Sequence, residues 1–68
     1  MSAATITANM IIRHLDTPRG QKVYSNARQS NAGKFGALCC VARDALPFLD
    51  TDAVFEAAAE AQAIRNLQ

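Results

Sequence analysis

The chain of 68 residues carries a net charge of +1, and half of its residues are hydrophobic, although fourteen of these are alanines, which bury little apolar surface. This length gives one small domain, residues 1 to 68, and excludes a large core, so we expect marginal stability unless a second copy adds buried surface. No run of 18 apolar residues and no basic segment followed by an apolar one is present, so we expect neither a transmembrane helix nor a secretory signal.

The first predicted element, residues 3 to 15, fits two structures. Ala8, Ile11, Ile12 and Leu15 recur at helical spacing, which predicts a helix. From position 4 to position 12, however, apolar residues also alternate with polar ones, which is typical of a strand. The pattern alone leaves both structures open.

The second element, residues 18 to 31, depends on how Thr17 and Pro18 are interpreted. In a helix, Thr17 is a good N-cap, Pro18 suits the first helical position, and Gly33 is placed to end the helix. Alternatively, a type I turn with Pro18 second and Gly20 fourth joins two strands in a hairpin. The polar residues after Gly20 favour neither alternative.

The third element, residues 34 to 46, has a clear apolar stripe at helical spacing. The stripe comprises Phe35, Leu38, Cys39, Ala42 and Leu46. Pro47 disfavours a helical conformation at Leu46, so the helix is expected to end there. Cys39 belongs to the stripe and is predicted to be a buried small hydrophobe, whereas Cys40 lies beside it.

The fourth element, residues 52 to 67, is predicted to be a helix capped by Asp50 or Thr51, with acidic residues near its positive end. Its apolar stripe is mostly alanine. The stripe comprises Val54, Ala57, Ala58, Ala61 and Ile64. Small side chains let another helix approach closely, so this stripe is also a candidate surface for a partner.

Together these elements predict an all-α fold, a compact bundle of four short helices at about residues 3 to 15, 18 to 31, 34 to 46 and 52 to 67. The alternative is an α+β fold, in which an N-terminal β-hairpin precedes two helices.

The only cysteines are the adjacent Cys39 and Cys40, which point about 100° apart on a helix, unlike the CxxC spacing of zinc sites. We therefore expect no metal and no cofactor. Without a disulfide or a metal, a chain this small is expected to form a homodimer. Unpaired thiols also fit a reducing compartment, which predicts a soluble cytoplasmic protein.

No catalytic constellation is recognised. His14 is the only histidine, and Asp16 would not share its helical face, so we expect a surface histidine near a helix end. Residues 31 to 34 offer amides and a lysine to an anion, but Arg28 and Phe35 stand where a P-loop needs Gly and Ser or Thr. The protein is therefore not expected to be an enzyme.

Charge is divided between the two halves of the chain. Residues 1 to 37 carry five basic side chains against one acidic, whereas residues 38 to 68 carry two basic and five acidic. The five basic residues are the candidate binding surface: Arg13, Arg19, Lys22, Arg28 and Lys34. The alternative is that they pair with the carboxylates of the second half, within one subunit or between two.

These observations predict a small non-enzymatic binding protein, an adaptor or inhibitor that acts by occupying a surface of a larger protein. An origin in a phage or another mobile element would suit such a chain. The alternative is a dimeric DNA-binding transcriptional regulator that uses the basic first half, because Arg, Lys, Gln and Asn are residue types that read DNA.

Overall fold

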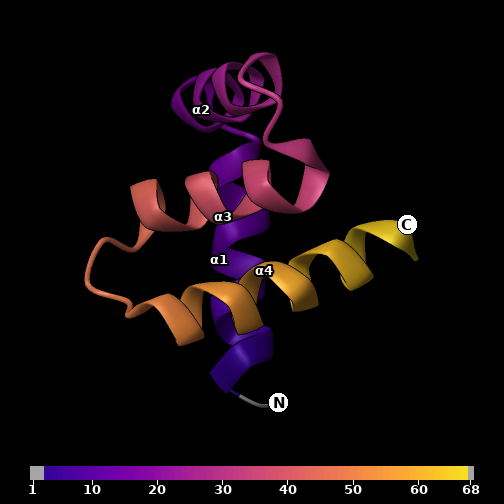
Figure 1. The fold of residues 1–68 in the computed structure, drawn as a ribbon. Helices are drawn as coiled ribbons and strands as arrows, with labels where there is room; N and C mark the ends of the chain where they lie inside the picture. The colour runs from indigo at the N-terminus through magenta and orange to yellow at the C-terminus, as the bar shows by residue number, and fades with distance from the viewer. Residues whose placement is uncertain (1–2, 68) are drawn as a thin grey trace.

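The computed structural model describes residues 3 to 67, with side chains from residue 5 onward. Four helices make up this part of the chain, and it contains no strand: α1 (Ala3–Leu15), α2 (Pro18–Gln29), α3 (Gly33–Ala45) and α4 (Thr51–Asn66) (Figure 1). The predicted all-α fold is confirmed, and each helix lies within two residues of its predicted bounds. The hairpin alternative for the first half is wrong.

The corner between α1 and α2 is built as the Thr17-Pro18 pair predicts. The side-chain oxygen of Thr17 accepts a hydrogen bond from the amide of Gly20 at 3.0 Å, and Pro18 is the first residue of α2. The cap satisfies an amide that a helix start leaves without a partner, and Pro lacks the amide that would need one.

The connection between α2 and α3 differs from its prediction. The helix α2 ends at Gln29, and Asn31, with φ 64°, takes the left-handed conformation in the turn between the two helices. Gly33, expected to end the second helix, instead begins α3 with φ 73°. Glycine adopts such a φ without strain, so Gly33 does mark a helix boundary, but the start of the next helix.

The start of α4 is fixed by Asp50. Its Oδ1 accepts a hydrogen bond from the amide of Ala53 at 2.8 Å, which selects Asp50 over Thr51 as the cap. Before it, α3 ends at Ala45, and the chain turns through Pro47 toward Leu49, whose amide donates to the carbonyl of Leu46.

The core lies where α1, α3 and α4 meet. Its largest fully buried side chains are Ile11, Leu38, Val41 and Val54. The alanine stripe of α4 is buried in it, since Ala57, Ala58 and Ala61 are at most 2% exposed. The stripe therefore brings α4 close to its own neighbours, and the suggestion that it is a surface for a partner is wrong.

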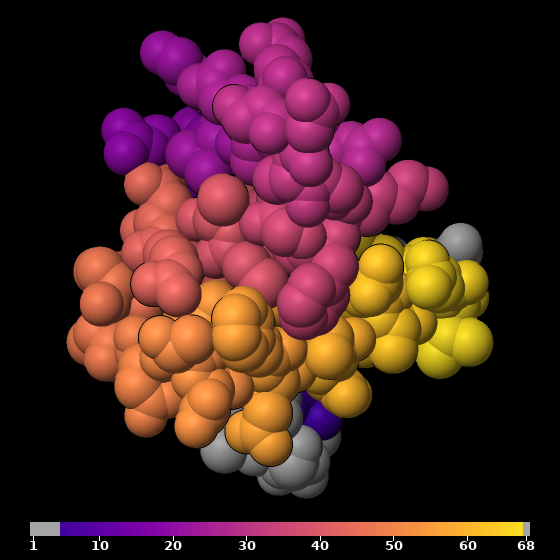
Figure 2. All heavy atoms as spheres, in the orientation of Figure 1, coloured from indigo at the N-terminus to yellow at the C-terminus, as the bar shows by residue number. Residues whose placement is uncertain are grey.

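The helix α3 lies between α2 and α4 (Figures 1 and 2). The helix α1 runs across the back of this layer (Figure 1). The Cα radius of gyration is 10.7 Å, close to the roughly 11 Å expected of a compact domain of this length. This order places the basic helix α2 and the acidic helix α4 on opposite sides of α3.

Candidate binding surfaces

The five predicted binding residues do not form one patch. Arg13 and Arg19 lie near the C-terminal end of α3, where Arg13 lines a shallow hollow and Arg19 bonds to Asp44. Lys34 lies in the first turn of the same helix. Because Lys34 and Asp44 are ten residues apart, they are separated by about 15 Å along the helix axis.

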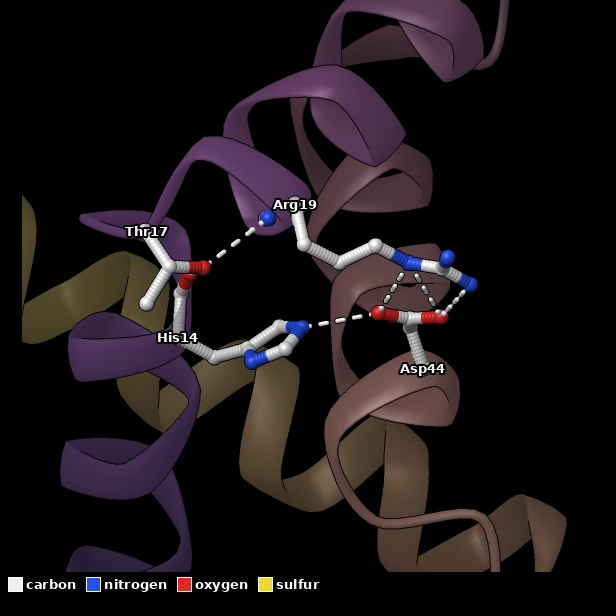
Figure 3. Close-up of polar contacts among 5 residues, drawn as sticks. His14, Thr17, Arg19 and Asp44 are labelled. Carbon is white, nitrogen blue, oxygen red and sulfur yellow. Dashed lines mark hydrogen bonds and ion pairs between the residues drawn. The ribbon is translucent and has the colours of Figure 1, made fainter.

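Arg19 and His14 meet on Asp44 (Figure 3). Nη2 of Arg19 lies 2.8 Å from Oδ1 of Asp44, and its Nε lies 3.2 Å from Oδ2. Nε2 of His14 lies 2.8 Å from Oδ2, and it donates there because an ionised carboxylate only accepts. One carboxylate of α3 therefore joins the end of α1 to the start of α2.

This arrangement changes the acidity of Asp44. Hydrogen bonds from Arg19 and then from His14 stabilise the ionised carboxylate, so the pKa of Asp44 is lowered from 3.8 to about 2. The same hydrogen bond raises the pKa of Arg19 above its ordinary value. Both effects widen the pH range over which the pair stays charged.

His14 is not the surface residue that the sequence predicted. It lies in the last turn of α1, as expected, but its side chain is only 24% exposed and is bonded to Asp44. Its partner lies 30 positions away, so no local pattern reveals it. The hydroxyl of Thr17 donates to the backbone carbonyl of His14, and this hydrogen bond stabilises the corner between α1 and α2.

Apart from Pro18 at its start, the exposed residues of α2 are polar. Its inner side rests on α1 and α3 through Gly20 and Ala27, which are buried. Its exposed residues include three basic side chains and no carboxylate: Arg19, Gln21, Lys22, Ser25, Asn26, Arg28 and Gln29. We call these seven residues the α2 face.

The carboxylates of α4 do not neutralise the α2 face within the subunit. Asp50 caps α4, and Glu60 accepts a hydrogen bond from Thr5 at 3.5 Å. Among the side chains described, from residue 5 to residue 67, the ion pairs are those of Asp44 with His14 and Arg19. Lys22 and Arg28 therefore have no carboxylate partner in this part of the chain.

All three phenylalanines of the chain lie at the surface. Phe35 is 38% exposed, Phe55 is 48% exposed and Phe48 is 79% exposed. The rings of Phe35 and Phe55 pack together with their centroids 6.2 Å apart, which joins α3 to α4 by a partly exposed aromatic pair. Phe35 was predicted to lie on the buried stripe of the third helix, but it lies at the margin of that stripe.

The two thiols differ as predicted, since Cys39 is buried and Cys40 is exposed. Burial raises the pKa of the Cys39 thiol, with the neighbouring Cys40 adding to the shift. Among residues 3 to 67, no cluster of three or more His, Cys, Asp or Glu side chains is placed to hold a metal ion. None of the helices in this range is long and apolar enough to cross a membrane.

Comparison of the chain with protein-family models, curated proteins and solved structures finds no match. Its function is therefore inferred from the chemistry of its own surfaces.

Proposed function

We propose that the protein is a small non-enzymatic binding protein, an adaptor or inhibitor, that occupies an acidic surface of a larger protein through the α2 face. The observation that carries this proposal is that α2 exposes three basic side chains and no acidic one. Arg19 is held by Asp44, so Lys22 and Arg28 supply most of the available charge. A surface of one sign speeds the encounter with an oppositely charged partner.

A hollow beside the α2 face favours a protein as the partner. It is formed by α2, the turn after this helix and the exposed side of α3. Its lining is Val23, Asn26, Ala27, Ser30, Ala32 and Cys40. Stable protein interfaces combine an apolar centre with a polar and charged rim, and here an apolar floor lies next to basic side chains.

The exposed aromatic pair supports a homodimer. Phe35 and Phe55 lie at the junction of α3 and α4, whereas α2 packs on the other side of α3 (Figure 1). Aromatic side chains are enriched at protein interfaces, and a small domain gains stability by covering them. A dimer formed through this junction leaves both α2 faces open to a larger partner.

A second candidate function, DNA binding, is favoured by the residue types of the α2 face. Lys22, Asn26, Arg28 and Gln29 are exposed, and such side chains hydrogen-bond to base edges in the major groove. A helix that presents them at one side of a small dimer is compatible with a recognition helix.

Affinity capture followed by a salt titration tests the proposal and separates the two functions. The chain is immobilised, and the proteins it retains from the lysate of its own host are compared with those retained by the Lys22→Glu/Arg28→Glu variant. We expect a protein with an acidic surface to bind the original chain and not the variant.

For DNA, the chain is titrated with a mixed-sequence duplex. An affinity for the duplex that falls about 10³-fold or more between 50 and 200 mM salt is typical of several phosphate contacts. That result would favour the DNA-binding regulator over the protein-binding adaptor or inhibitor.

A further inference from the structure

We propose that a hollow between α2, α3 and α4 is a binding site for a phosphate group. It is lined by Tyr24, Lys34, Leu38, Gln62, Arg65 and Asn66. This site is distinct from the hollow beside Cys40, and it does not depend on protein binding through the α2 face.

Two cations converge on this hollow from different helices. Lys34 lies in the first turn of α3, and Arg65 lies in the last turn of α4. No carboxylate lines the hollow, and within residues 5 to 67 neither cation forms an ion pair. Two positive charges held near each other without an acid favour an anion between them, and a doubly charged one most.

The lining also restrains Arg65 and includes residues with neutral hydrogen-bond donors. The guanidinium of Arg65 lies over the ring of Tyr24, 5.7 Å from its centroid, which restrains the long arginine side chain. Tyr24, Gln62 and Asn66 also line the hollow, and their side chains carry further hydrogen-bond donors. Leu38, 2% exposed, belongs to the floor.

The hollow has room for a phosphate group. Its volume is about 180 Å³, and a water molecule occupies roughly 30 Å³ of the liquid. A phosphate group fits in this space, and because the hollow is open to solvent, the rest of a larger ligand can extend outside it.

A second hollow, next to the first, indicates why we expect the anion to bind beside Lys34. It shares Tyr24 and Arg65 with the first, but Asp16 is part of its lining. A carboxylate there repels a bound anion and attracts Arg65. Of these two hollows, the one that Lys34 lines has two cations and no carboxylate.

Nuclear magnetic resonance titration of the whole chain with inorganic phosphate, and then with O-phosphoserine, tests the site. We expect saturable shifts of the backbone amides centred on the six lining residues. Lys34→Met and Arg65→Met should each weaken binding by about tenfold or more, because each removes a charged hydrogen-bond donor. Lys22→Met, which removes the same charge from an exposed position on α2, is the matched control and should leave the affinity unchanged.

A peptide containing phosphoserine identifies the source of the phosphate group. Affinity about tenfold or more above that of O-phosphoserine would assign the site to a phosphorylated protein segment, whereas equal affinity would assign it to a free phosphate ester. Shifts that do not saturate, or equal weakening by Lys22→Met and Lys34→Met, would overturn the proposal. Unchanged amide spectra of the free variants verify that the fold is intact.

Discussion

The first turn of α2 contacts the last turn of α1 so closely that a Cβ atom on Gly20 would overlap the carbonyl oxygen of His14. The same Cβ would lie 2.9 Å from the Cα of Leu15, closer than such atoms approach. Both neighbours are backbone atoms, which cannot move aside as a side chain can. Position 20 therefore accepts only glycine, and this contact fixes how α2 sits on α1.

Gly20→Ala should lower the free energy of unfolding by about 1 to 3 kcal/mol, because the added methyl group forces the two helices apart. The control is Ser25→Ala, an exposed position on the same helix, which should change stability by no more than about 0.5 kcal/mol. Urea unfolding measures both. Equal midpoints for Gly20→Ala and the original chain would show that the corner between α1 and α2 has room for a methyl group.

Leu38→Ala should destabilise the fold far more than Cys40→Ala. Leu38 is 2% exposed within the core, whereas Cys40 lies at the surface of the same helix. Truncating a buried leucine costs about 2 to 5 kcal/mol, which is a large fraction of the stability of a small domain. If the two variants unfold at the same urea concentration, the Leu38 side chain is not packed in the core.

The stability of the protein should fall as the pH drops from about 4 to about 2. Asp44 has a pKa of about 2 when folded and 3.8 ordinarily, so over this interval the unfolded chain binds more protons than the folded one. The stabilisation from the ionised Asp44 carboxylate is fully present above the ordinary pKa of 3.8. It is lost as the pH falls through the folded-state pKa of about 2.

Asp44→Asn tests this assignment, because the amide does not titrate. Its free energy of unfolding, measured in urea at several pH values, should decline less steeply between about pH 4 and pH 2 than that of the original chain. The same slope for both would mean that the contacts of Asp44 with His14 and Arg19 do not contribute.

Sedimentation at micromolar concentration should show a homodimer that Phe55→Ser weakens, because this change removes one ring of the exposed aromatic pair. Phe48→Ser is the matched control, since Phe48 is more exposed than Phe55 and lies in a loop outside that pair. A monomer that unfolds cooperatively on its own would rule out the dimer. Equal weakening by both substitutions would place the interface elsewhere.

Local signals predicted the elements well. Thr17, Pro18 and Asp50 act through hydrogen bonds or dihedral angles within a few residues, and the helix starts they mark are observed. The alternation in the first element did not produce a strand, because alternate residues such as Ala8 and Ile12 also fall on one side of a helix that has α3 and α4 to pack against.

Contacts between residues far apart in the sequence could not be predicted from the sequence alone. The bond of His14 to Asp44 spans 30 positions, and the need for glycine at position 20 arises only when α2 lies on α1. The burial of the alanine stripe likewise depends on which helix covers it. The candidate binding residues were chosen by charge alone, and only the packed structure separates Arg19, which is bound to Asp44, from Lys22 and Arg28.

The central claim is that the α2 face binds an acidic protein, and the most direct test is the rate at which the captured partner associates with the Lys22→Glu/Arg28→Glu variant. A charge-matched control, Arg13→Glu/Arg43→Glu, reverses two exposed arginines outside α2. We predict that the α2 variant associates about tenfold or more slowly than the original chain, that added salt slows the original chain in the same way, and that thermal melts followed by circular dichroism stay unchanged. Association of the α2 variant at the original rate, or an equal loss in the control, would contradict this claim.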